Sequence, residues 1–103
     1  MASKPLVIHE EAAAEYESAF DWYFERSRLA ASRFAEEFNQ ATWKISEVPN
    51  RWPIHMLGTR KLLFQHFPFA IVYRELPASI QIVAVAHGRR RPGYWQGRLL
   101  TVL

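Results

Sequence analysis

Residues 80–87 read Ile-Gln-Ile-Val-Ala-Val-Ala-His, and this stretch decides how the chain folds. Successive side chains of a strand point to opposite faces of a sheet. The two sets here are Ile80, Ile82, Ala84 and Ala86 on one face, and Gln81, Val83, Val85 and His87 on the other. Both faces are largely apolar and both need cover, so we expect this strand at the centre of a sheet.

Two further runs that are rich in strand-forming residues precede this stretch. They are Lys61–Gln65 (KLLFQ) and Phe69–Leu76 (FAIVYREL). Only His66-Phe67-Pro68 and Pro77-Ala78-Ser79 separate the runs. Because such short connections join neighbouring antiparallel strands, the three runs predict an antiparallel sheet.

The first half of the chain has the three- and four-residue spacing of helices. A first helix is predicted from Glu10-Glu11, where negative charge favours a helix start. Its apolar face holds Ala13, Tyr16, Phe20, Tyr23 and Phe24, and its other side holds Glu15, Ser18, Trp22, Glu25 and Arg26.

A second apolar stripe predicts a helix from about Leu29 to Val48, which Pro49 ends. The stripe consists of Ala31, Phe34, Phe38, Ala41, Ile45 and Val48. Ser27 is the predicted N-cap of this helix, in a tight corner formed by residues 26–28. Two amphipathic helices joined in this way form an antiparallel hairpin.

These elements predict an α+β fold in the order β-α-α-β-β-β, with the helical hairpin packed on one face of a small, mainly antiparallel sheet. Pro5–His9 is the first strand, whose pairing the sequence leaves open, and residues 49–60 form a loop. The length of 103 residues suits one domain, residues 1–103. The absence of cysteine and of a long apolar run at the N-terminus predicts a cytoplasmic protein that has no membrane association.

Charge divides the chain into two unequal halves. Residues 1–50 hold five Lys/Arg and nine Asp/Glu, whereas residues 51–103 hold eight Lys/Arg and one acid, Glu75. This asymmetry predicts a basic working face on a neutral-to-acidic scaffold.

The basic half is densest directly after the central strand, where the chain reads His87-Gly88-Arg89-Arg90-Arg91 and continues through a Pro-Gly turn to Tyr94 and Trp95. Guanidinium groups grip phosphates or carboxylates, so the stretch predicts a site for a polyanion or for an acidic protein. If the ligand is RNA that is cleaved without a metal, the candidate catalytic residues are Arg60, His87, Arg89, Arg90 and Tyr94. The alternative is a solvated basic turn, with a structural His87 and with Tyr94 and Trp95 as a lid on the core.

Two tryptophans, Trp22 and Trp43, fall outside the main helical stripes. We favour burial under a wide apolar face, and the alternative is an exposed aromatic patch for a partner. The candidate partner-binding residues are Trp22, Trp43, Arg89, Arg90, Arg91 and Trp95. No cofactor is predicted and no metal, because the four histidines are scattered and no glycine-rich phosphate loop is present.

The order of several short motifs resembles the RelE/ParE superfamily of toxins from type II toxin–antitoxin modules, also known as plasmid-stabilisation proteins. The motifs are E-Y-x-x-A-x-x-W-Y (residues 15–23), A-x-x-F-x-x-x-F (31–38), P-N-R-W-P (49–53), G-T-R (58–60), F-P-F-x-I-V-Y-R (67–74) and A-V-A-H-G-R-R (84–90) followed by P-G-Y-W. The resemblance covers nearly the whole chain and implies the β-α-α-β-β-β fold.

The same resemblance implies a growth-inhibiting toxin that a cognate antitoxin neutralises. ParE-like members inhibit DNA gyrase, whereas RelE-like members are ribosome-dependent, metal-free mRNA endoribonucleases. The nuclease branch commonly has an arginine where this chain has Ala70, and a methyl group does not stabilise a phosphate. Arg89, Arg90 and Tyr94 match the nuclease pattern, but the basic pair also occurs in the ParE-like branch. We therefore favour the ParE-like branch, with the nuclease as alternative and a non-toxic nucleic-acid-binding module as a third hypothesis.

Overall fold

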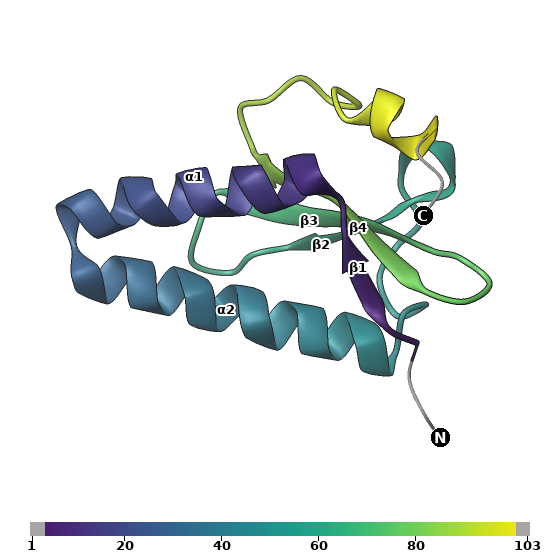
Figure 1. Cartoon of the computed structure of the whole chain (residues 1–103), viewed down its shortest axis with the longest axis horizontal. Helices are drawn as coiled ribbons and strands as arrows, with labels where there is room; N and C mark the ends of the chain where they lie inside the picture. The colour runs from purple at the N-terminus through teal and green to yellow at the C-terminus, as the bar shows by residue number, and fades with distance from the viewer. Residues whose placement is uncertain (1–3, 101–103) are drawn as a thin grey trace.

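Two antiparallel helices cover one face of a four-stranded sheet in the computed structural model, which describes residues 4–100 (Figure 1). The elements in chain order are β1 Leu6–Ile8, α1 Glu10–Arg26, α2 Arg28–Glu47, the 3-10 turn η1 Met56–Gly58, β2 Arg60–Leu63, β3 Phe69–Glu75, β4 Ile80–His87 and the 3-10 turn η2 Gln96–Leu100. The predicted α+β class and the order β-α-α-β-β-β are confirmed.

The sheet has the strand order β1-β4-β3-β2, so β4 is internal as its two apolar faces predicted. The strands β2, β3 and β4 pair antiparallel, and β1 pairs parallel to β4 with Leu6 opposite Ile80 and Ile8 opposite Ile82. This register answers the question that the sequence left open. Because β1 is three residues long and β4 eight, β1 covers only the first part of that side of β4.

A single residue, Ser27, joins the two helices. Its N–H donates to the Tyr23 carbonyl at 2.7 Å and closes α1, while its hydroxyl accepts from the Ala30 N–H at 3.1 Å and caps α2. The predicted N-cap is therefore confirmed. Figure 1 shows the hairpin extending beyond the sheet at this turn.

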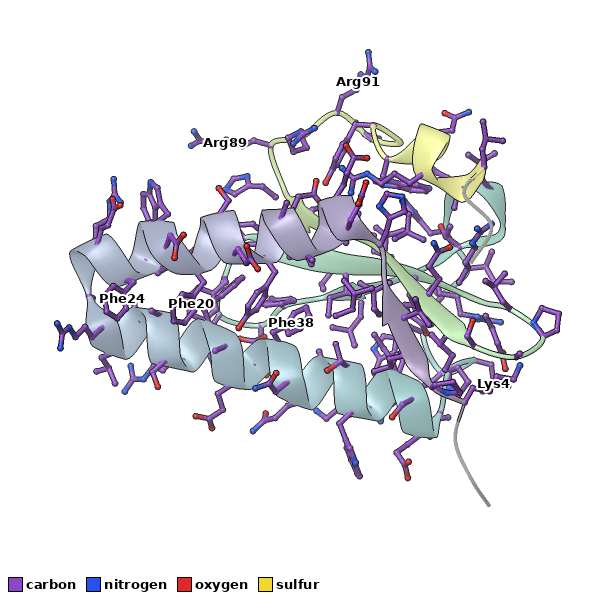
Figure 2. The ribbon with its side chains drawn as sticks, viewed as in Figure 1. Lys4, Phe20, Phe24, Phe38, Arg89 and Arg91 are labelled. Atoms are coloured by element: carbon purple, nitrogen blue, oxygen red, sulfur yellow. The ribbon has the colours of Figure 1, made fainter. Side chains whose placement is uncertain are left out.

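The main core lies between the hairpin and the sheet, and Phe34 is fully buried at its centre. The Phe34 ring lies 5.3–5.5 Å from aromatic rings of α1 and of the β2–β3 region, namely Tyr16, Tyr23, Phe64, Phe67 and Phe69. Two members of the predicted stripes lie outside the core, because Phe24 is 45% and Val48 46% exposed near the hairpin turn and after α2. Figure 2 shows Phe24 beside the turn and Phe38 deeper in the layer between the helices and the sheet.

The predicted side-chain alternation of β4 is wrong after Ile82. Val72 pairs with Ala84 and Tyr73 pairs with Ile82, so Val83 is an extra residue that has no partner in the register. An extra residue reverses which face later side chains occupy. Val85 consequently joins Ile80 and Ile82 in the main core, whereas Ala84 joins Val83 in a second cluster on the helix-free face.

The aromatic packing around Phe34 predicts a large loss of stability when this ring is removed. Phe34→Ala should lower the free energy of unfolding by about 3–5 kcal/mol, because a fully buried ring leaves a cavity. Urea denaturation followed by circular dichroism measures the change. Phe24→Ala, from the same helical pair, should cost less than about 1 kcal/mol, and equal losses in both variants would contradict this view of the core.

Candidate functional site

Glu15 organises the part of the molecule where β4 extends past β1. The sequence placed Glu15 on the outer side of α1, but its carboxylate lies against β4. Glu15 Oε1 accepts the backbone N–H of Val85 at 3.0 Å, and Arg98 Nη1 donates to the Val83 carbonyl at 3.1 Å. Glu15 and Arg98 therefore satisfy a backbone donor and acceptor that the next strand of the sheet would otherwise take.

The two side chains also bind each other in a bidentate ion pair. Arg98 Nη1 donates to Glu15 Oε1 at 2.8 Å and Arg98 Nη2 donates to Oε2 at 2.9 Å. Tyr94 donates its hydroxyl to Glu15 Oε2 at 2.6 Å. Burial by itself raises the pKa of Glu15, but the hydrogen bonds from Arg98, Tyr94 and the Val85 N–H outweigh it and leave this pKa below its ordinary value.

The same network changes the acidity of its two other members. Burial, followed by the hydrogen bond to Glu15, raises the pKa of the Tyr94 hydroxyl far above its ordinary value. The hydrogen bond to Glu15 raises the pKa of Arg98. At neutral pH the Tyr94 hydroxyl therefore keeps its proton and donates a hydrogen bond to Glu15, which is a structural role.

Arg90 is positioned by this network. Its guanidinium carbon lies 3.7 Å from the centre of the Tyr94 ring, and Nη1 lies 3.9 Å from Glu15 Oε2. About half of the Arg90 side chain is exposed. The stacking holds a solvent-accessible cation in a fixed direction.

Arg90 borders a cleft of about 440 Å³ between α1 and the end of β4. The apolar lining comes from Ala19, Tyr23 and Phe69, and Trp22 is the exposed aromatic residue of the cleft. The Arg26 guanidinium carbon lies 3.7 Å from the ring centre of Trp22 and fixes its orientation. An apolar cleft with the Arg90 guanidinium at its border suits an acidic ligand with one apolar side chain.

The five predicted catalytic residues do not form one site. Arg60 pairs with Tyr73 on β3, whereas His87 pairs with Phe69 four residues away, which corresponds to about 13 Å along the strand. The Arg60 guanidinium is occupied by carbonyl groups of the preceding loop, with Nη1 2.7 Å from the Trp52 oxygen. Arg60 therefore lies apart from the other four candidate catalytic residues.

The remaining predicted residues lie near one another but have different tasks. His87 and Tyr94 border the same cleft as Arg90. His87 Nδ1 accepts the Arg89 N–H at 3.0 Å, so the imidazole stabilises the turn. Figure 2 shows Arg89 and Arg91 pointing outward from the loop, away from the network that holds Arg90. The methyl group of Ala70 is buried in the sheet.

The three candidate tryptophans differ in exposure. Trp22 is 52% and Trp43 63% exposed, so the favoured interpretation of burial is wrong for both. Trp43 lies on α2 and is not among the residues of the cleft. Trp95 is 2% exposed and covers Val72 and Val83 on the helix-free face, as the lid interpretation expected, so this candidate partner-binding residue has little surface to offer a partner.

Glu15 and Arg98 are the site residues that the sequence analysis missed. Glu15 belongs to the motif E-Y-x-x-A-x-x-W-Y, which was a signal that this position differs from an ordinary surface acid. Arg98 follows the basic turn in a short segment with no strong pattern, so no local signal marks it. Within residues 4–100 there is no group of three His, Asp or Glu side chains that could hold a metal ion.

Comparison with known proteins places the chain in a family. The family model described as "ParE toxin of type II toxin-antitoxin system, parDE" matches residues 6–92. The chain belongs to this family. The protein is thus a ParE-like toxin of a type II toxin–antitoxin system, and such a system implies a cognate antitoxin as partner.

A solved structure supports the fold of this ParE-like toxin. A chain of the chromosomal ParDE toxin–antitoxin system from P. aeruginosa is similar to it with a TM-score of 0.72 and 21% sequence identity, over 82% of this chain and 96% of that chain. No significant match was found among curated proteins. In the described part of the toxin, no helix is long and apolar enough to cross a membrane.

The lowered pKa of Glu15 predicts how the stability of the toxin depends on pH. A carboxylate whose pKa is lower in the folded chain contributes stability that is complete above the unfolded pKa, near 4.5, and that is lost as the pH falls through the folded value. Glu15→Gln should therefore lower the free energy of unfolding at pH 7 by about 1.5–3 kcal/mol and should flatten its decline between pH 7 and pH 3. Urea denaturation across this range tests the prediction, with Glu17→Gln on the exposed side of α1 as control. Parallel pH profiles for the wild type and Glu15→Gln would contradict it.

Proposed function

We propose that this toxin inhibits DNA gyrase by binding and that it does not cleave RNA. On this proposal the toxin belongs to the ParE-like branch of the superfamily and acts in the cytoplasm. Its cognate antitoxin keeps it inactive.

One observation carries the choice of binding over cleavage, namely the absence of an assembled nuclease site among the described residues. Metal-free RNA cleavage needs a base, an acid and cations around one phosphate. Here Arg60 is bound to the Trp52 carbonyl and lies far along the sheet from His87. Tyr94 is engaged by Glu15, and Ala70 offers no charge to a phosphate.

We further propose the cleft beside Arg90 as an antitoxin-binding site. Arg90 provides a positive charge at one rim, next to Arg89 and Arg91 in the chain, and Trp22 provides an exposed aromatic surface at the cleft. A peptide that places an apolar side chain in the cleft and carboxylates on the arginines would be complementary to it. An acidic antitoxin segment has this chemistry.

Replacement of Trp22 tests the antitoxin site. Trp22→Ala should weaken antitoxin binding at least about 30-fold, the change expected for a central aromatic anchor. Isothermal titration calorimetry with the purified antitoxin measures the affinity. Trp43→Ala is the matched control, because Trp43 is also more than half exposed but is not among the residues of the cleft. If the Trp22→Ala toxin binds the antitoxin with unchanged affinity, the cleft is not part of the antitoxin interface.

The choice of target is tested with purified components. The toxin should inhibit supercoiling of relaxed plasmid by purified DNA gyrase, and mRNA from intoxicated cells should show no new 5′ ends by primer extension. Undisturbed supercoiling at high molar excess of toxin would contradict the gyrase proposal. Cleavage sites that disappear in Arg90→Ala would support the ribonuclease instead, and normal growth on induction without antitoxin would contradict both activities.

A further inference from the structure

The loop between α2 and β2 presents an apolar knuckle, which we define as residues 54–57. Its three large apolar side chains are exposed, Ile54 by 71%, Met56 by 39% and Leu57 by 56%. The knuckle does not include residues of the cleft beside Arg90. Figure 1 shows the short coil of this loop at the opposite end of the molecule from the hairpin turn.

Leu57 is unfavourable at its position on two independent grounds. Its backbone has φ 57° and ψ 35°, the left-handed region that a bulky L-residue rarely occupies. Its side chain gains little from burial because more than half of it is exposed. Asparagine or glycine would relieve the backbone, so folding alone does not explain a leucine here. Backbone strain of this kind is concentrated at functional positions.

The knuckle is nevertheless held firmly at its base. The His55 N–H donates to the Thr59 carbonyl at 2.7 Å, and the hydroxyl of the buried Thr59 donates to the Met56 carbonyl at 2.6 Å. Ile54 forms an isolated bridge to Arg60. The partly exposed Met56 side chain also packs on Gly93, because a Cβ atom added at Gly93 would lie 2.9 Å from Met56 Cε.

The charge around the knuckle indicates the partner's chemistry. Residues 48–74 contain no aspartate or glutamate, and Arg51, Arg60 and Lys61 lie within seven residues of the exposed apolar side chains. Exposed apolar side chains on a backbone that hydrogen bonds hold in place suit a preformed apolar pocket, which a folded protein offers and an extended peptide does not. The complementary surface is therefore an apolar pocket with an acidic rim on a folded protein.

We infer that the knuckle is the contact that this toxin makes with its target, and that the antitoxin cleft beside Arg90 is a separate surface. This inference rests on the proposed function, because it takes DNA gyrase as the folded partner. It assigns Leu57 as the central anchor, whose strained backbone directs an apolar side chain outward.

The test is Leu57→Asn, which removes the apolar side chain and relieves the backbone. We expect a melting temperature equal to or above that of the wild type, because asparagine tolerates this conformation. The concentration of toxin that halves supercoiling by purified gyrase should rise at least about tenfold, whereas the affinity for purified antitoxin stays unchanged. Leu29→Asn is the matched control, since Leu29 is 59% exposed at the hairpin turn, and it should inhibit gyrase like the wild type.

The outcomes separate this inference from the proposed function. Full inhibition by Leu57→Asn beside an active wild type would overturn the inference alone. A parallel loss of antitoxin affinity would also overturn it, because the knuckle would then belong to the antitoxin interface. A wild-type toxin that leaves gyrase unaffected would overturn both the proposed target and the assignment of the knuckle to it. Leu57→Gly repeats the test with a second residue that suits the backbone, and a difference between the two variants would contradict an anchoring role of the leucine side chain.

Discussion

The structure depends on how the backbone hydrogen bonds are satisfied along the side of β4 that β1 only partly covers. β4 is eight residues long, pairs with β3 on one side and pairs with the three-residue β1 on the other. On the β1 side, the backbone of β4 beyond Ile82 therefore has no neighbouring strand within the described chain. Glu15 and Arg98 take up the Val85 N–H and the Val83 carbonyl there. Unpaired backbone groups are costly when buried, and this ion pair removes that cost while it ties α1 to the C-terminal segment.

The same pair determines what the surface presents. Because Glu15 also accepts the Tyr94 hydroxyl, the ring of Tyr94 is fixed, and Arg90 stacks on it at the edge of the cleft. If the antitoxin binds this cleft as proposed, structural stability and partner recognition share one carboxylate. On our proposals the toxin has two separate surfaces, a cationic cleft for its antitoxin and an apolar knuckle for its target.

Several features were predictable because they depend on neighbours in sequence. The helical stripes, the Ser27 cap and the antiparallel order of the last three strands follow from periodicity, local hydrogen bonding and short connections. The parallel pairing of β1 was not predictable, because a three-residue strand has no local signal for its partner. The basic turn was visible in the sequence, but the separation of Arg60 from it depends on the register of β2 against β3.

The sequence by itself determined the fold class, the family resemblance and the strong positive charge of the second half. These features depend on composition and on the regular spacing of residue types, which do not change with the detailed three-dimensional arrangement of the chain. Only the tertiary structure decided that Glu15 faces inward, that Trp95 is buried and that Trp22 and Trp43 are exposed. The physical reason is that one extra residue at Val83 reverses the alternation of β4, and that contacts between residues 15, 94 and 98 join segments about 80 positions apart, which no local pattern records.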